Sequence, residues 1–188
     1  MKLNFKEIDD NELVLLIVPS GSVDEVNRSV LEYFANKKGA VCVYTTFSKT
    51  YKVVFKNLKK YKIDTKKIFF IDCVTPVSEF GEINIADKVV FCQPNSLTNI
   101  SISITTALKN LPQDKNRVLI LDTISTLMLY NDKKDVIKFL HFLSGTIRKY
   151  GVKSLIFTLD EESDKSLISE ISLFCDVSLR LSQLQQKE

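Results

Sequence analysis

Apolar runs alternate with segments of helical periodicity along almost the whole chain. The runs are rich in β-branched and aromatic residues, so they predict strands at 13–18, 40–47, 67–74, 88–92, 117–122, 152–159 and 176–181. Between them, apolar positions spaced three and four residues apart predict helices at about 22–36, 49–60, 96–110, 134–149 and 164–173. This regular alternation is typical of an α/β protein.

The predicted strands are continuously apolar and do not alternate with polar residues, as in LVLLIV (13–18) and RVLILD (117–122). Such strands are covered on both faces, which indicates a mostly parallel sheet between two helical layers. Gly39 and Gly151 each follow a predicted helix and precede a strand, where a left-handed residue commonly ends a helix. We therefore predict a single three-layer α/β domain over residues 1–188, with its core at about 13–181. Ligands of such sheets bind at the carboxyl ends of the strands.

Composition narrows the class of protein but names no partner. The chain has 188 residues, 45% of them hydrophobic, which suits one well-buried domain. The 26 basic and 23 acidic side chains nearly balance. No apolar run approaches the roughly 18 residues of a spanning helix, and the first residues, MKLNFKEIDDNE, lack the apolar core of a signal peptide. We expect a cytoplasmic protein without membrane contact. The four cysteines form no CxxC pair, which favours buried thiols over zinc ligands or disulfides.

Three longer segments resemble the RecA/KaiC-like ATPases. RVLILDTISTLMLYN (117–131) is similar to a Walker B strand, with four apolar residues, Asp122 and a small hydroxylated residue. DVIKFLHFLSGTIRKYGVKSLIFTL (135–159) resembles the helix and strand that follow it in that family. GAVCVYTTFSKTYKVVFKNLKKYKIDTKKIFFIDCV (39–74) resembles the family's second strand, helix and third strand. The resemblance covers about 13–181 and implies that strands 13–18 and 117–122 flank strand 152–159.

The family's nucleotide-binding residues are mostly missing. Its phosphate loop requires glycines, a lysine and a Ser/Thr, whereas this chain has PSGSVDEVN (19–27). The lysine position falls at about Asp24, and the family's catalytic glutamate falls near Ser48 or Lys49. Asp122, which in the family holds magnesium through water, remains. The resemblance thus implies no catalytic residue, no metal site and no ATP–magnesium cofactor, but a vestigial nucleotide site made of Ser20, Gly21, Ser22, Asp24 and Asp122.

The segment SVDE (22–25) has the pattern of a capping box. In that arrangement the Ser22 hydroxyl accepts from the N–H of Glu25, and the Glu25 carboxylate accepts from the N–H of Ser22. Asp24 adds a second carboxylate in the first turn. We therefore predict that the positive end of this helix is neutralised by its own side chains and repels a triphosphate.

Acidic residues follow or end several strands, so we expect them to gather at the carboxyl edge of the sheet with Asp24 and Glu25. They are Asp72, Asp122, Asp160, Glu161, Glu162 and Asp164. Such an edge excludes anions and favours cations or a basic protein surface. Three interpretations stay open: solvated loop residues and helix caps, a cation site formed by Asp72 and Asp122, or a surface for a basic partner.

A lysine stripe is predicted on the helix at 49–60. On a helical wheel the apolar residues Tyr51, Val54, Phe55 and Leu58 lie opposite one basic row. The basic row is a candidate anion-binding surface, either for nucleic-acid phosphates or merely solvated. It consists of Lys49, Lys52, Lys56, Lys59 and Lys60.

Three functional interpretations remain. We favour a non-hydrolysing regulatory or scaffolding domain that acts by binding a protein. The second is a nucleic-acid-associated accessory protein, like the degenerate recombinase paralogues of the RecA superfamily. The third is an ATP-binding protein with an unconventional phosphate loop, in which Arg28 would be the substitute cation although it lies about one turn too far along the helix. The sequence does not determine the oligomeric state.

Overall fold

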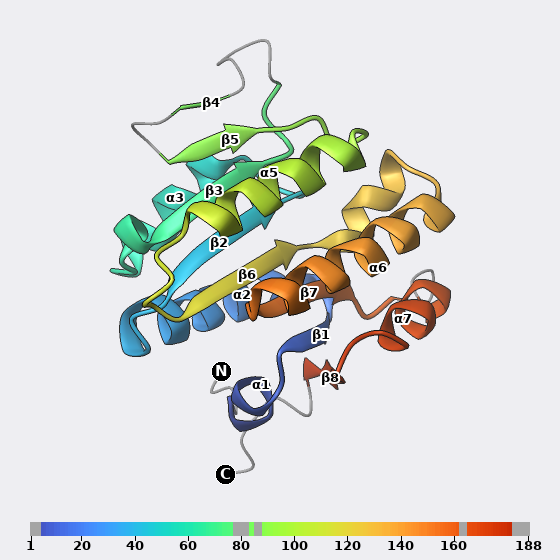
Figure 1. Ribbon diagram of the computed structural model, residues 1–188, viewed down its shortest axis with the longest axis horizontal. Coiled ribbons are helices and arrows are strands. Elements are labelled where there is room, and N and C mark those ends of the chain that lie inside the picture. Colours follow the sequence, from blue (N-terminus) through green and yellow to red (C-terminus); the bar gives the residue numbers. More distant parts are fainter. Residues whose placement is uncertain (1–4, 77–82, 85–87, 162–164, 182–188) are drawn as a thin grey trace.

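The computed structural model describes residues 5–76, 83–84, 88–161 and 165–181 (Figure 1). These residues form an eight-stranded sheet in the order β4-β5-β3-β2-β6-β7-β1-β8. The strands are β1 (Leu13–Val18), β2 (Val41–Thr46), β3 (Ile68–Asp72), β4 (Ile83–Asn84), β5 (Val89–Phe91), β6 (Arg117–Asp122), β7 (Lys153–Leu159) and β8 (Val177–Arg180).

Seven strands are parallel, and the edge strand β4 pairs antiparallel with β5. β7 lies between β1 and β6, with Leu16 opposite Phe157 and Ile120 opposite Leu155. The predicted mostly parallel sheet is therefore confirmed, and so is the predicted flanking of the strand at 152–159. The short β4 lay outside the predicted set of strands.

Helices cover both faces of the sheet, as predicted for three layers (Figure 1). One core cluster packs α1, α2 and α3 on one face, and a second packs α5, α6 and α7 on the other. Successive residues of β1 enter different clusters, Leu16 the first and Leu15 the second. The α-helices are α1 (Lys6–Asp10), α2 (Val23–Leu31), α3 (Tyr51–Lys60), α5 (Leu97–Asn110), α6 (Lys133–Tyr150) and α7 (Lys165–Ser172).

Shorter helical segments complete the chain path. A π-helical segment, η2 (Glu32–Lys37), continues α2, and the 3-10 segments are η1 (Ser20–Ser22), η3 (Thr65–Lys67) and η4 (Ile124–Leu129). Gly39 and Gly151 have φ of +66° and +56°, which confirms the two predicted left-handed positions. No helix among the described residues is long and apolar enough to cross a membrane. The four cysteines are free, and Cys42, Cys73 and Cys92 are buried.

Residues 5–12, before β1, pack against the rest of the domain. α1 buries Ile8 completely, and the ring of Phe5 stacks on Tyr33 with centroids 4.0 Å apart. Lys153 donates through Nζ to the carbonyl oxygens of Ile8 and Asp9, at 2.7 and 3.0 Å. These long-range contacts attach α1 to the sheet, and a local sequence pattern does not contain them.

Candidate functional site

The loop between β1 and α2 lies where the RecA/KaiC-like resemblance placed a nucleotide site. Residues 19–22 join the strand to the helix, and the N–H of Ser22 donates to the carbonyl of Pro19 at 2.9 Å. Ser22 makes no side-chain cap hydrogen bond, so the predicted capping box is wrong. The physical reason is that η1 runs directly into α2, which leaves Ser22 at φ −109° and ψ −5° and not in the extended conformation of an N-cap.

Asp24, in the first turn of α2, forms an ion pair with Lys49. Lys49 lies in the loop before α3, because Thr46 Oγ1 donates to the Lys49 carbonyl at 2.6 Å and accepts from its N–H at 3.3 Å. The prediction that Lys49 belongs to the lysine stripe of the following helix is therefore wrong. The pair brings together two positions that the sequence assigned to different surfaces.

Asp122, at the end of β6, is 3% exposed, and its Oδ2 accepts from the hydroxyl of Tyr44. Within the described part of the chain, Asp122 Oδ1 and Asn27 Oδ1 are buried without a hydrogen-bond partner. Burial raises the pKa of Asp122, while hydrogen bonds from Tyr44 and Asn27 oppose that shift. Sequence analysis missed Tyr44 and Asn27. Asn27 lies three residues after Asp24, which places both on one face of a helix and was an available signal.

These groups line a cavity of about 290 Å³ at the carboxyl edge, hereafter the edge cavity. Gly21 and Glu25 also line it, together with Arg28 and Tyr61. The guanidinium of Arg28 lies 4.2 Å from the centre of the Tyr61 ring and 3.9 Å from the Glu25 carboxylate. The structure thus gathers Gly21, Asp24 and Asp122 of the predicted vestigial site. Ser20 and Ser22 lie in the adjacent turn.

Asp72 does not join Asp122 in a cation site. Its fully buried carboxylate accepts from the N–H of Tyr51, Val74 and Thr75 and from the Thr75 hydroxyl, at 2.6 to 3.0 Å. Thr46 of β2 lies between Asp72 and Asp122 in the sheet, so the two aspartates are about two strand spacings, or ~10 Å, apart. One cation cannot bind both carboxylates at that separation. No group of metal-binding side chains occurs in the described ranges.

The remaining acids do not form one cluster either. Asp160 pairs with Arg180 at the end of β8, and Glu161 is exposed. Glu162 and Asp164 lie outside the described residues. The described acids of the edge therefore lie apart, either with separate partners or exposed, which fits the interpretation as loop residues better than the other two.

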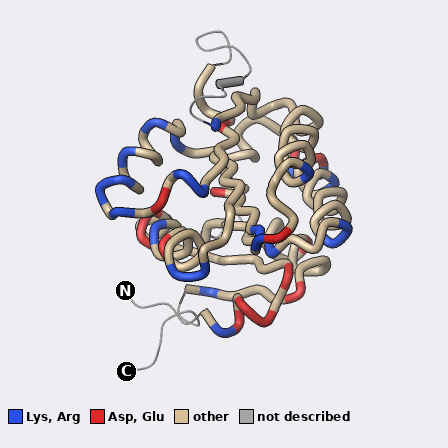
Figure 2. Tube along the Cα trace, turned by 60° about the vertical axis from the view of Figure 1, so that its left-hand side comes forward, with Lys and Arg blue, Asp and Glu red and all other residues tan. Residues whose placement is uncertain are grey.

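The rest of the predicted lysine stripe lies on α3. Lys52, Lys56, Lys59 and Lys60 are exposed, and the opposite positions Tyr51, Val54 and Leu58 are buried in the core. Basic residues are also spread over other parts of the molecule and do not concentrate on a single face (Figure 2). The α3 lysines are thus a solvent-facing row on an amphipathic helix.

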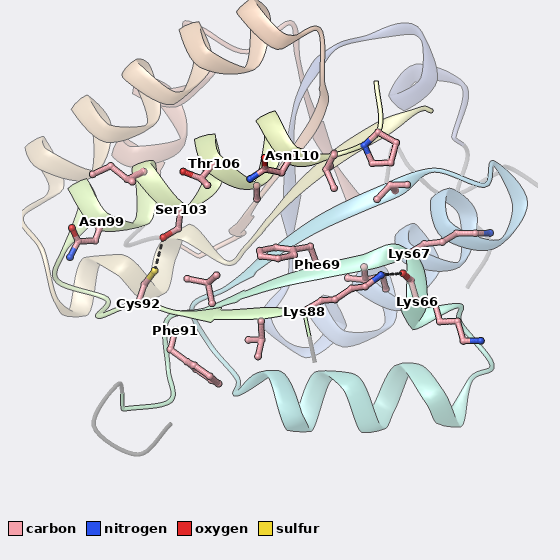
Figure 3. Close-up of a pocket in the computed structure, with 18 of the residues that line it drawn as sticks. Lys66, Lys67, Phe69, Lys88, Phe91, Cys92, Asn99, Ser103, Thr106 and Asn110 are labelled. Atoms are coloured by element: carbon pink, nitrogen blue, oxygen red, sulfur yellow. Dashed lines mark hydrogen bonds between the residues drawn. The ribbon is translucent and has the colours of Figure 1, made fainter. Parts of the chain in front are cut away.

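A larger cavity, which sequence analysis missed, lies between α5 and the strands β3 and β5, and we call it the α5 groove (Figure 3). Its volume is about 1030 Å³. Phe69 and Val90 line it and are only partly buried. Val89 and Phe91 also border it, but their side chains, like that of Phe70, belong to the core under α3. The strand pattern gave no sign of this difference, because both sets of residues are equally apolar.

Solved structures with the same fold come from an archaeon. The KaiC-like protein PH0186 from Pyrococcus horikoshii OT3 matches with a TM-score of 0.64 and 15% identity, over 90% of this chain and 72% of that one. The uncharacterized protein PH0321 from P. horikoshii, solved with an unknown peptide, matches with a TM-score of 0.66 and 13% identity, over 93% and 82%. At these identities the similarity shows a KaiC/RecA-like fold and no more.

Comparison of the sequence with curated proteins finds no match. A family profile, however, matches residues 64–181, from the turn before β3 to the end of β8. This segment is more than half of the chain. The chain therefore belongs to the family of unknown function DUF7504.

Proposed function

We propose that this chain is a non-hydrolysing KaiC-like domain that regulates or scaffolds by binding another protein. The observation that carries the proposal is that the groups at the nucleotide position are already bonded within the chain. The loop amide of Ser22 is bonded to Pro19, and Lys49, a basic residue of the edge cavity, is held by Asp24. A phosphate loop must instead offer free backbone N–H groups and a free lysine to the phosphates.

Charge at the start of α2 supports the same conclusion. Asp24 and Glu25 lie in the first turn, where they neutralise the positive end of the helix dipole. Asp122 keeps the position of a magnesium-binding aspartate, but magnesium in such sites depends heavily on substrate phosphates. The residues of the edge cavity therefore do not fit a magnesium–triphosphate complex well, and we propose that the domain uses no nucleotide cofactor.

Two features support protein binding in place of nucleotide chemistry. The α5 groove is larger than the edge cavity, at about 1030 against 290 Å³, and much of its lining is apolar. A concave surface of that kind is a usual place for a ligand or partner. PH0321, which has the same fold, was solved with a peptide bound, and we take this as support for peptide binding by this fold.

A thermal-shift comparison tests the proposal. We expect millimolar ATP–magnesium to leave the melting temperature unchanged. A ligand with micromolar Kd at millimolar concentration would stabilise the folded chain by about 4 kcal/mol, which is easily detected. An ATP-dependent shift that Asp122→Ala abolishes would contradict the proposal and favour the ATP-binding alternative.

The second half of the proposal, that the domain binds another protein, is tested by co-purification. We expect the tagged chain, purified from the cells that naturally make it, to carry one protein in stoichiometric amount. A matched sample treated with nuclease should keep that protein. Loss of the partner on nuclease treatment would instead favour the nucleic-acid-associated alternative.

A further inference from the structure

We propose that the α5 groove binds an extended segment of the partner protein, about five residues long, with apolar side chains and an acidic residue at one end. This inference rests on the proposed protein-binding function and assigns a site to it. Three features of the groove carry the inference: its apolar floor, its polar wall and its basic end.

The floor comes from the sheet. Phe69 of β3 and Val90 of β5 point to the α5 side and pack only partly into the core. Ile102 of α5 also lines the groove and is 59% exposed. On the opposite face of the same strands, α3 covers Phe70 and Phe91, and the Tyr51 ring lies 6.1 and 5.9 Å from theirs. The α5 side therefore offers apolar surface whose burial would favour a partner.

The wall is a row of short polar side chains on α5. They are Asn99, Ser103, Thr106 and Asn110, whose spacing of four, three and four residues places them on one face. Figure 3 shows the four above the floor. The Ser103 hydroxyl and the Cys92 thiol form a hydrogen bond, with 3.3 Å between Oγ and Sγ. The side chains of Asn99, Thr106 and Asn110 make no hydrogen bond to any described residue.

The length and chemistry of the wall match a polypeptide. From Asn99 to Asn110 the helix advances eleven steps, a rise of about 16 Å. This length equals about five residues of extended chain at ~3.3 Å each. An extended backbone must pair its N–H and C=O groups when it leaves water. Side-chain amides and hydroxyls can both donate and accept, so this wall can pair with a backbone of either direction.

The basic end of the groove determines where the acidic residue of the bound segment lies. Lys66, Lys67 and Lys88 lie together at the end of the groove opposite Cys92 and Asn99 (Figure 3). Lys67 pairs with Asp64 at 3.3 Å, but Lys66 and Lys88 form no ion pair within the described ranges. Lys88 Nζ donates to the Lys66 carbonyl at 2.9 Å, which holds the two together. Unpaired lysines beside an apolar floor attract a carboxylate.

These three features together favour a peptide over other occupants. Drug-sized ligands occupy cavities of about 300–1,000 Å³, and the groove is at the upper limit of that range. A nucleic acid would require basic residues along the groove and not at one end. A fatty acid would satisfy the lysines but leave the amide and hydroxyl wall without partners.

A phage-displayed library of twelve-residue peptides, selected against the folded chain, tests the proposal. We expect enriched peptides to combine apolar residues with an acidic residue at one end. Their affinity, measured by fluorescence anisotropy, should fall at least about tenfold in Ile102→Glu and in the double variant Lys66→Glu/Lys88→Glu, as for a central interface residue. Each of these side chains is exposed, so folding should be retained, and circular dichroism checks it.

Matched controls place the same changes elsewhere. Phe142→Glu puts the same charge on α6 at a side chain 64% exposed, and Lys56→Glu/Lys60→Glu reverses two charges on α3. Both controls should bind the peptides like the unaltered chain.

Three results would overturn the groove assignment. The library yields no enriched peptide; the enriched peptides bind all variants equally; or decanoate binds and Ile102→Glu abolishes it while peptides do not bind. Equal binding by all variants would leave the proposed protein-binding function standing. An ATP-dependent melting shift would instead remove the proposed function, whatever the peptides do.

Discussion

The carboxyl edge of the sheet and the α5 groove differ in how their polar groups are satisfied. At the carboxyl edge, Asp72 accepts four hydrogen bonds, Asp24 pairs with Lys49, and Asp122 accepts from Tyr44. These partners come from the chain itself, whereas Asp122 Oδ1 and Asn27 Oδ1 are buried at the same edge without a partner among the described residues. In the α5 groove, Asn99, Thr106 and Asn110 make no hydrogen bond to any described residue. We therefore expect the edge to act mainly in the stability of the fold, and we propose the groove as the surface that binds a partner.

The difference matters because the proposed binding groove departs from the usual expectation for this architecture. Parallel α/β sheets bind ligands at the carboxyl ends of their strands, and the groove lies on a face of β3 and β5. Buried polar groups must be paired within the fold or carry a cost, whereas exposed ones remain paired with water until a ligand arrives. Residues at the edge should thus affect stability, and residues in the groove should affect binding.

The largest expected effect is at Asp72. The variant Asp72→Ala removes the acceptor for three backbone N–H groups and one hydroxyl, so we expect the free energy of unfolding to fall by about 3 kcal/mol. Chemical denaturation measures this change. As a control, Thr75→Val removes one of the four hydrogen bonds and should cost about 1 kcal/mol. Equal losses of unfolding free energy in the two variants would show that the backbone hydrogen bonds to Asp72 add nothing to stability.

Replacement of Asp122 is expected to change the free energy of unfolding by a smaller amount and in the opposite direction. Burial raises its folded-state pKa above the ordinary value of 3.8, so the folded chain binds the proton more tightly than the unfolded chain. The stability therefore falls as pH rises from about 3.8 through the raised folded-state pKa. Asp122→Asn removes the buried charge, so we expect it to stabilise the fold at neutral pH by roughly 1 kcal/mol and to flatten this pH dependence.

Denaturation at several pH values measures the Asp122 effect. Tyr44→Phe is its counterpart, because it removes the hydroxyl that donates to Asp122 and should destabilise the fold at neutral pH. Destabilisation by Asp122→Asn at neutral pH would show that the charged form of Asp122 is needed by the fold.

The smallest effect is expected on α3, which covers the face of β3 and β5 opposite the groove. Replacing Lys52, Lys56 and Lys59 by glutamine should change the stability by less than about 0.5 kcal/mol, because these side chains face solvent. Binding to short DNA and RNA at physiological salt should be no tighter than ~10⁻⁴–10⁻⁶ M, the level of non-specific attraction. Submicromolar binding that the triple variant loses, with a salt slope of about −0.7 to −0.9 per contact, would favour the nucleic-acid interpretation.

Much of the fold could be predicted because the apolar pattern is local. The runs at 13–18 and 117–122 became β1 and β6 with the predicted boundaries. The failures involve a competing contact. Lys49 was assigned to a helix by its spacing, but Thr46 holds its backbone in the preceding loop and Asp24 holds its amine. The capping box failed because η1 runs directly into α2, which leaves the Ser22 backbone outside the extended conformation of an N-cap.

The candidate site was predicted only in part. Asp24 and Asp122 were identified through the family resemblance, and both line the edge cavity. Tyr44 was read as one apolar strand residue among others, and its hydroxyl meets Asp122 only because β2 and β6 are neighbours. The α5 groove was missed entirely, because its residues come from several segments between Val41 and Lys115 that only the packing of the sheet and α5 brings together.

The sequence by itself determined the order of elements and the mostly parallel sheet, since both depend on residue type and short-range spacing. Tertiary structure alone decided which apolar strand residues remain accessible in the groove and which are buried in the core. Phe69 and Phe70 are adjacent and chemically identical, yet the first lines the groove and the second is buried near Tyr51. Successive side chains of a strand point to opposite faces, and whether a helix fully covers each face is settled by packing between distant segments.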